Sequence, residues 1–353
     1  MAVVTYKCPN CGGGLKFDPA SQKFACEYCL SKFDEEALKD KFPLEKEPEA
    51  EEPSSRKEAP SEEAVVYNCP SCGAQVVTCE TTAATFCFYC HNPVVLAGRL
   101  EGRYLPEKII PFAVPKEKVT QDLKNWLKSK SFVPRGFFSD DQVEKLTGVY
   151  FPHWMVDCDV HASVEGTGRN LRLWRIGDIE YTETSLYNIS RKADIHFKDI
   201  TKTALKKADA QLVEGVQPYD AGGLKDFDMS FLSGFQAEKR DIEQEEMTAA
   251  VQQEVNEYAA SMIRQQISGY DSVSLNDSRC TVKKTDWSYS LLPVWVLAYR
   301  DKATNKLYHY AVNGQTGKVC GEAPVDKRKL NLATLGVGLA SFLILMLIGW
   351  WLR

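Results

Sequence analysis

The chain has 353 residues, of which 44% are hydrophobic and 26% charged, and its formal net charge is −5. This length is typical of two or three domains, and the composition excludes a wholly disordered chain, a collagen-like fibre and a protein with many membrane spans. The excess acid lies in one stretch, because residues 34–64 carry twelve acids and five bases while residues 65–353 carry 34 of each. The chain as a whole is therefore no polycation of the kind that binds nucleic acid through charge alone.

Eight of the twelve cysteines form two groups with identical spacing. In each group, two Cys-x-x-Cys pairs are separated by fourteen residues, and the second group repeats the first in register. The groups are Cys8, Cys11, Cys26 and Cys29 in residues 1–40, and Cys69, Cys72, Cys87 and Cys90 in residues 65–98. Two residues between thiolates let one tight turn aim both sulfurs at one ion, and two such turns complete a tetrahedron. We therefore predict two structural Zn²⁺ sites.

The physical chemistry of such small units favours a structural metal. Each unit is too short for a self-sufficient apolar core, so a metal must supply the free energy of folding. Four cysteines leave no open coordination position, so neither site is expected to be hydrolytic. Redox dithiols occur as single pairs and disulfides are rare in the cytoplasm, whereas iron–sulfur ligation fits the same spacing and stays open. We expect Gly12 and Gly73 to take positive φ after the second ligand.

Each unit resembles a zinc ribbon of the rubredoxin or transcription-factor-IIB type. Because many proteins with such ribbons bind nucleic acid, the resemblance raises that function as a hypothesis. The second unit, from Tyr67 to Pro93, contains no Lys or Arg and offers nothing to phosphates. Residues 6–33 of the first unit carry only four lysines against two acids. We therefore expect the ribbons to contact proteins, and nucleic acid is an unlikely partner.

Residues 41–64 join the two units. Four prolines stand there among runs of acidic residues, with few large apolar side chains. Proline and like charge together favour an extended chain, so we interpret this segment as an acidic, proline-rich linker.

Residues 99–325 are predicted to form an α+β cytoplasmic domain. Helical spacing of apolar residues predicts helices over 115–128 and 242–267. Runs of β-formers predict strands over 149–164, 178–197, 273–287 and 291–300, with a hairpin turn at 313–317. The sequences Pro152-His153-Trp154 and Pro293-Val294-Trp295 share the pattern Pro-x-Trp. They indicate either two related helix-sheet units within this domain or a chance match, and both interpretations stay open.

No enzymatic motif is present in this domain. It lacks a P-loop, a metalloprotease H-E-x-x-H and a nucleophile elbow, and its histidines show no ligand spacing. His153, beside Trp154 in an apolar strand, is interpreted as a buried core residue. The cluster of Arg169, Arg172, Trp174 and Arg175 has the composition of a phosphate contact, but a solvated strand edge is the preferred interpretation. We predict no catalytic residues, no small-molecule substrate and no enzymatic activity.

The last predicted element is a membrane-spanning helix. Residues 330–352 contain no charge, and as a helix they would span roughly 35 Å, enough for a bilayer core of about 30 Å. Lys327, Arg328 and Lys329 precede this segment and are expected on the cytoplasmic side, whereas Trp350 and Trp351 suit the far interface. We predict a single-pass, tail-anchored protein of the cell membrane, with the N-terminus and the bulk of the chain in the cytoplasm.

The whole layout is similar to that of a bacterial family of membrane-anchored proteins with transcription-factor-IIB-type zinc ribbons. Besides the ribbons, the similarity rests on Ile110-Pro111-Phe112, on residues 147–152 and on residues 310–319. Relatives tend to be encoded beside phage-shock (PspA-type) and SPFH-domain membrane-stress proteins. The resemblance thus implies a non-enzymatic adaptor that recruits such proteins to the bilayer through its ribbons. The alternative is a membrane-tethered factor that binds nucleic acid or acts in transcription.

Overall fold

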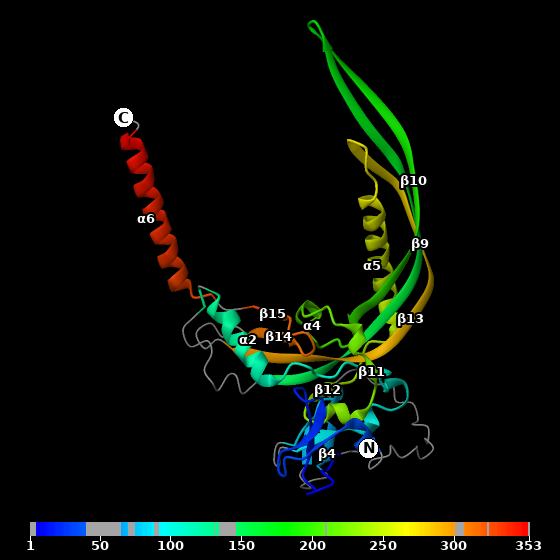
Figure 1. Ribbon diagram of the computed structural model, residues 1–353, viewed down its shortest axis with the longest axis vertical. Coiled ribbons are helices and arrows are strands. Elements are labelled where there is room, and N and C mark those ends of the chain that lie inside the picture. Colours follow the sequence, from blue (N-terminus) through cyan, green and yellow to red (C-terminus); the bar gives the residue numbers. More distant parts are fainter. Residues whose placement is uncertain are drawn as a thin grey trace.

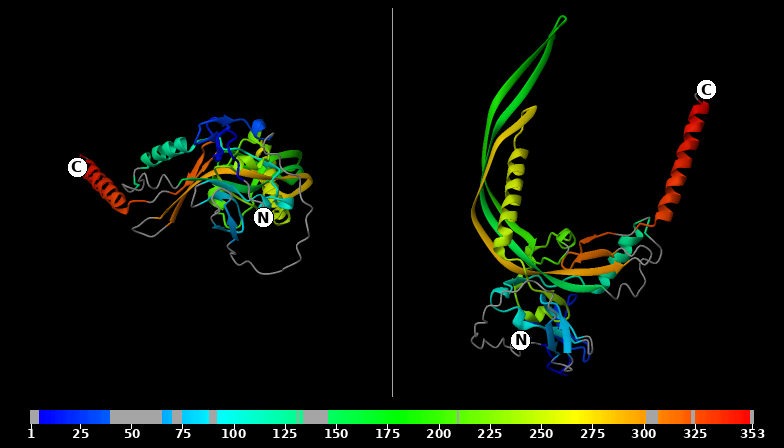
Figure 2. Two further views of the ribbon diagram at one scale, coloured as in Figure 1. Left: turned by 90° about the horizontal axis from the view of Figure 1, so that it is seen from below. Right: turned by 180° about the vertical axis from the view of Figure 1, so that it is seen from behind.

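The computed structural model describes residues 5–39, 65–69, 75–87, 92–130, 132–133, 146–208, 210–300, 307–322 and 325–351. The described chain has the shape of a U (Figure 1). A base holds the N-terminal units and the middle of a large sheet. A long curved arm rises on one side of the base, and the C-terminal helix α6 (Lys327–Trp351) rises on the other. Views from below and behind show the same arrangement (Figure 2).

Three long strands organise the large sheet: β9 (Thr147–Ile176), β10 (Ile179–Thr203) and β13 (Ser272–Arg300). β9 pairs antiparallel with β10 on one side and with β13 on the other. Seven shorter strands complete the ten-stranded sheet. They are β6 (Thr82–Phe86), β7 (Pro93–Val95), β8 (Lys108–Ile109), β11 (Lys225–Asp226), β12 (Gln236–Glu238), β14 (Leu307–Asn313) and β15 (Val319–Gly321).

The arm consists of the outer parts of β9, β10 and β13, covered on its inner side by α5 (Gln244–Gln265) (Figures 1 and 2). Alternate residues of β9 are buried there, namely Val156, Cys158, Val160, Ala162 and Val164. The residues of α5 that pack against them are four apart in sequence, namely Val251, Val255, Ala259 and Ile263. The alternate buried residues of β9 thus pack against one face of α5.

The remaining helices are short or peripheral. They are α1 (Glu35–Lys39), α2 (Lys116–Lys128) and α4 (Ala210–Gly215). The expected helices over 115–128 and 242–267 are confirmed as α2 and α5. The expected strands over 149–164 and 178–197 are confirmed as β9 and β10, which run further than predicted, and the turn at 313–317 connects β14 to β15. The two strands predicted over 273–287 and 291–300 are one continuous strand, β13, so the predicted break between them was wrong. A mixed α+β fold is therefore observed.

The proposed repeat around Pro152 and Pro293 stays a prediction. The register pairs Pro152 with Leu291 and Tyr150 with Pro293, so the two motifs lie on neighbouring antiparallel strands.

An aromatic cluster forms the core of the base. The Phe112 ring stacks on Phe235 with centroids 4.2 Å apart and meets Tyr150 and Trp295 edge-on, each at 5.0 Å. The backbone N–H of Phe112 donates to the Tyr150 hydroxyl at 3.3 Å, and the Trp295 indole N–H donates to the carbonyl of Val114 at 2.9 Å. Buried Tyr and Trp need such partners, and these bonds join the segment before α2 to β9 and β13.

The first cysteine unit packs directly on this base. Its strands β1 (Leu15–Asp18), β2 (Lys23–Cys26) and β3 (Lys32–Phe33) form a three-stranded antiparallel sheet. Phe17 and Phe24 of this sheet contact Phe231, which lies in a short 3-10 helix, Met229–Leu232. The Ser233 hydroxyl donates to the Leu15 carbonyl at 2.5 Å. The predicted linker over 41–64 lies outside the described residues, but the unit before it is docked on the base.

Two strand pairings of the second unit match pairings of the first, with the same offset that relates the two cysteine groups, whereas the described residues hold no counterpart of the β1–β2 pairing. β4 (Val65–Asn68) pairs with β5 (Gln75–Thr78) so that Asn68 faces Gln75, as Lys7 faces Gly14 in the first unit. β6 pairs with β7 so that Thr85 faces Val94, as Phe24 faces Phe33. The units differ in surroundings, because β6 also pairs with β12 and so belongs to the large sheet.

His153 is fully buried, as expected for a core residue. Its Nδ1 lies 2.9 Å from the Phe151 carbonyl oxygen, and its Nε2 lies 3.5 Å from the Thr203 hydroxyl. Burial lowers the pKa of His153 to about 4, although the bond to Phe151 opposes this shift. The imidazole is therefore neutral in the folded protein at neutral pH, which is consistent with a structural role.

Replacing Phe231 tests how the first unit is held. Phe231→Ala removes a fully buried ring shared by the unit and the base, and we expect it to lower the free energy of unfolding by about 3–5 kcal/mol. Denaturant unfolding measures this change. Leu173→Ala, at an exposed position, is the matched control and should alter stability by no more than about 0.5 kcal/mol. Equal effects of the two substitutions would contradict this assignment.

Acid should destabilise the fold through His153. Its folded pKa of about 4 lies below the unfolded value of 6.5, so its contribution is complete above pH 6.5 and is lost as pH falls towards 4. The full loss is about 3 kcal/mol. Urea unfolding of the wild type and of His153→Gln, each at about pH 7 and about pH 5, measures the contribution of His153 to the pH dependence of the free energy of unfolding. An unchanged pH dependence in the variant would contradict it.

Candidate metal centre

The first cysteine group is assembled in space. The Sγ atoms of Cys8, Cys11, Cys26 and Cys29 all lie within 4.8 Å of one another. The Cys8 and Cys29 sulfurs are 3.5 Å apart, and those of Cys11 and Cys26 are 3.4 Å apart. A tetrahedral Zn²⁺ with bonds of about 2.3 Å places its sulfur ligands about 3.8 Å from each other. The four side chains thus have the type and spacing of a closed metal site and can hold a metal ion.

Two tight turns bring the sulfurs together. In the first turn the N–H of Gly12 donates to the Cys8 carbonyl at 2.8 Å, and in the second the N–H of Leu30 donates to the Cys26 carbonyl at 3.0 Å. Gly12 has φ of 75°, which confirms the predicted positive value, and Gly73 lies outside the described residues. Leu30 also has positive φ, 59°, although a leucine adopts this region at a cost. Sequence reasoning did not anticipate that strain.

The electrostatics of the four thiols also suit a cation. The backbone N–H of Gly13 lowers the pKa of Cys11, but the neighbouring Cys26 and Cys29 outweigh it, and the pKa is raised to about 12. The Ser31 hydroxyl and backbone lower the pKa of Cys29 to about 6. Four thiols this close cannot all ionise without a compensating positive charge. A bound metal supplies that charge and would hold all four as thiolates.

The second group is described only in part. Cys69 and Cys87 are buried in one cluster with Tyr67, Val94 and Leu96, whereas Cys72 and Cys90 lie outside the described residues. Cys87 occupies the same local structure as its counterpart Cys26. The N–H of Cys87 donates to the carbonyl of Asn92, just as the N–H of Cys26 donates to that of Ser31 at the equivalent place in the first unit.

The other candidate ligands are dispersed. Among the described residues, the first cysteine group alone brings three or more Cys, His, Asp or Glu ligand atoms together. Cys158 is buried under α5, Cys79 is exposed, and Cys280 and Cys320 lie partly buried at other places in the fold. The arm carries two His–Asp pairs, His161 with Asp194 and His196 with Asp159, on neighbouring strands.

Helix α6 is long and apolar enough to cross a membrane. Its most apolar window has a mean hydropathy of 2.3, and none of that window is buried against the rest of the protein. It begins beside the base, where the Asp326 carboxylate accepts the N–H of Arg328 at 2.9 Å and the Lys329 ammonium donates to the Val133 carbonyl at 2.6 Å. Trp350 and Trp351 are highly exposed at its far end.

Fold and site together define a class: a mixed α+β protein with an N-terminal four-cysteine cluster and a C-terminal helix able to span a bilayer. The chain is 33% identical, over 346 residues, to an uncharacterized protein of Bacillus subtilis (strain 168), YdjG. This match covers 98% of the chain and 97% of the Bacillus protein, so the chain belongs to the same family. No protein-family model matches the chain. No solved structure matches it either.

Metal analysis of the purified chain tests the site. We expect zinc near two equivalents per chain, falling by one in the double variant Cys8→Ser, Cys11→Ser, because each pair contributes half of one tetrahedron. Cys79→Ser, an exposed cysteine outside both groups, is the control and should retain the full amount. Iron instead of zinc, or an unchanged content in the double variant, would overturn the assignment.

Proposed function

We propose that this protein is a non-enzymatic, tail-anchored membrane adaptor whose two Cys₄ zinc ribbons bind protein partners. Helix α6 anchors it in the cell membrane, and Lys327, Arg328 and Lys329 keep its N-terminus and bulk in the cytoplasm. The resemblance of its layout to membrane-anchored ribbon proteins points to membrane-stress proteins of the PspA or SPFH type as partners. The observation that carries the proposal is an exposed apolar surface on the first metal knuckle.

That surface consists of Tyr28 and Leu30, which flank the ligand Cys29. Tyr28 is 72% exposed and Leu30 is 80% exposed. Leu30 moreover keeps a positive φ, where glycine or asparagine would be less strained. A strained, exposed leucine contributes nothing to the core. Its presence beside an aromatic ring on a rigid metal-bound turn is what a protein-binding surface requires.

The charges of this unit favour a protein over a nucleic acid. Lys16, Lys23 and Lys32 pair with Glu27, Asp34 and Asp18, at 2.8, 2.9 and 3.1 Å respectively. Lysines engaged with acids of their own unit form a weak footprint for phosphates, since binding to a nucleic acid backbone depends on cations available to it.

The second zinc site is supported by the shared strand registers. The constant offset that relates the two cysteine groups in sequence also relates the β4–β5 and β6–β7 pairings to those of the first unit. Because this backbone geometry positions the four sulfurs in the first unit, we infer the same arrangement for Cys69, Cys72, Cys87 and Cys90.

The test is a quantitative pull-down from detergent-solubilised membranes with the full chain as bait. In the double variant Tyr28→Ser, Leu30→Asn, we expect loss of the partner proteins that the wild type enriches, with zinc content unchanged. Asparagine is chosen because it tolerates positive φ. Leu105→Asn, another exposed leucine, is the matched control and should retain every partner.

Two outcomes would contradict the proposal. Identical partner sets for wild type and double variant would show that the knuckle surface binds no protein. Salt-sensitive binding of DNA or RNA by the purified chain would support the alternative, a membrane-tethered nucleic-acid-binding factor.

A further inference from the structure

The end of the arm is the most apolar exposed surface of the described residues outside α6. Beyond the pair Arg169–Ser272, β13 no longer accompanies β9, and α5 has already ended at Gln265. Residues 170–186 therefore continue as a two-stranded hairpin, called here the hairpin tip, which only Asn170 and Leu171 at its start still tie to Gly269 and Asp271 by hydrogen bonds among the described residues. A hairpin of this kind is only marginally stable in water without something to pack against.

The hairpin tip exposes large apolar side chains on both faces, among polar and charged ones. One face carries the stacked rings of Trp174 and Tyr181, 5.6 Å apart, together with Ile176 and Ile179. The other carries Leu171, Leu173 and, beside Arg169, Leu186. Exposed fractions of these seven side chains run from 39% for Leu171 to 68% for Leu186.

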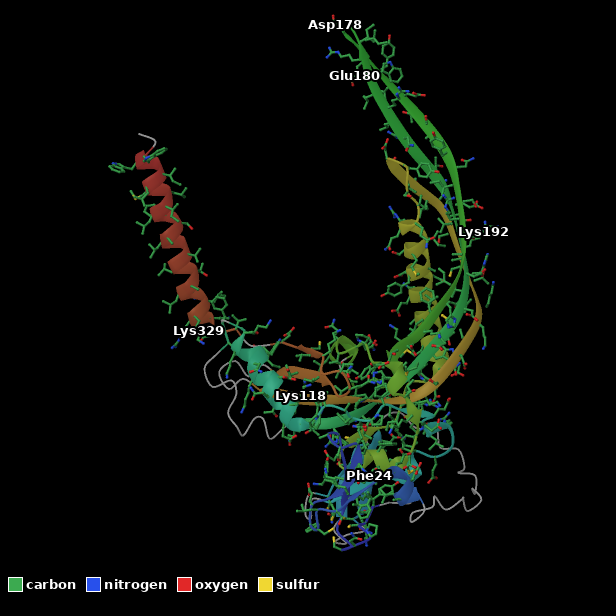
Figure 3. The ribbon with its side chains drawn as sticks, viewed as in Figure 1. Phe24, Lys118, Asp178, Glu180, Lys192 and Lys329 are labelled. Carbon is green, nitrogen blue, oxygen red and sulfur yellow. The ribbon has the colours of Figure 1, made fainter. Side chains whose placement is uncertain are left out.

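The aromatic face continues the face of β9 that α5 covers lower in the arm. Even-numbered residues of β9 pack under α5, and side chains alternate without interruption to Trp174 and Ile176. The outer side of the arm is polar, with ion pairs such as Lys283–Asp194 and with Lys192 exposed on it (Figure 3). Tyr258 and Met262, both exposed on α5, add apolar surface to the inner side. Apolar groups thus gather on the side that faces α6.

The hairpin tip and α6 stand at the two ends of the U. Figures 1 and 2 show the arm curving away from α6 over its middle and bending back towards it at the tip. Figure 3 labels Asp178 and Glu180 at the tip and Lys329 at the start of α6. Because α6 and the arm rise side by side from the base, the bilayer surface reaches the tip and clears the polar, three-stranded middle of the arm when α6 crosses it at a steep tilt (Figure 1).

The chemistry of the hairpin tip determines how deeply it can enter a bilayer. Its outer backbone edges are unpaired, so it cannot enter the hydrocarbon core, where unsatisfied N–H and C=O groups are too costly. Trp and Tyr prefer the headgroup level. The arginines at 169, 172 and 175 are balanced in number by Asp178, Glu180 and Glu183, and Arg172 lies over the Trp174 ring at 5.7 Å. The apolar and aromatic groups, and no excess of charge, would drive the contact.

We propose that the hairpin tip inserts into the interfacial layer of the same bilayer that α6 crosses, as a second membrane contact at the opposite end of the U. The occupant of this surface is lipid, and zwitterionic lipid suffices because the tip, with two arginines against one aspartate and two glutamates, carries no excess of positive charge for anionic headgroups. The inference depends on the membrane anchoring by α6 and is independent of what the zinc ribbons bind.

Photocrosslinking of the full chain in phosphatidylcholine vesicles tests the proposal. The photoreactive amino acid p-benzoylphenylalanine replaces Trp174 at the tip or, as the control, Lys192 on the outer side of the arm. We expect a product heavier by one phospholipid from position 174 and none from position 192, with no loss in high salt. A product of twice the chain mass would mean that a second copy covers the tip, and equal lipid adducts at both positions would also overturn the proposal.

A second variant guards against chance collisions with lipid. Ile176→Glu with Ile179→Glu, added to the chain with the probe at 174, should reduce the lipid adduct to the level of the Lys192 control. Both isoleucines are exposed, so folding and zinc content should not change. Co-flotation with vesicles should persist through α6, and its loss in the wild type would show instead that the anchor had failed. A persistent adduct in this variant would contradict the proposal.

Discussion

The antiparallel pairing of β9 with β13 is the interaction on which the rest of the structure depends. It runs from Thr147 opposite Val296 in the base to Arg169 opposite Ser272 in the arm, with two shifts of register along the way. The inner parts of both strands carry Tyr150 and Trp295, which build the aromatic core around Phe112. The outer parts supply the surface on which α5 packs. One continuous ladder therefore makes base and arm a single body and holds the tip far from the anchor.

The metal centre and the base stabilise each other. A unit as small as residues 5–39 cannot bury enough apolar surface by itself, and a metal ion held by its four cysteines would compensate for that deficit. The unit also places Phe17 and Phe24 against Phe231, so its hydrophobic side is completed by the base. The ligand turn with Tyr28 and Leu30 remains outside this contact. The fold thus gives the knuckle rigidity from two sources and leaves its apolar residues exposed.

The two ends of the protein differ in how far their apolar residues are covered by other segments. At the base, apolar residues of distant segments cover each other, and the exposed ones concentrate on the knuckle. At the far side, the seven exposed side chains of the hairpin tip and the bare surface of α6 have no counterpart within the described chain. If both meet lipid, the U would lie against the bilayer with its ribbons turned away from it, accessible to cytoplasmic proteins.

Much of this could be predicted from sequence because the signals are local. The Cys-x-x-Cys turns, the positive φ of Gly12, the four-residue spacing in α5 and the uncharged run of α6 each depend on residues within a few turns of one another. Strand alternation in β9 is equally local and indicated a strand. It did not indicate where β9 loses β13 as a neighbour, because that end point depends on residues far away in the sequence.

The sequence by itself therefore determined the first four-cysteine cluster, most of the helices and strands, and a segment able to span a membrane. Tertiary structure alone decided that the first ribbon is docked, because Phe17 and Phe231 lie in widely separated parts of the chain and no spacing rule connects them. It also decided that the cluster around Trp174 and its arginines lies at a bare hairpin end on the same side of the protein as α6. The exposure of a side chain depends on which distant segments pack against it, and no local pattern in the sequence encodes that.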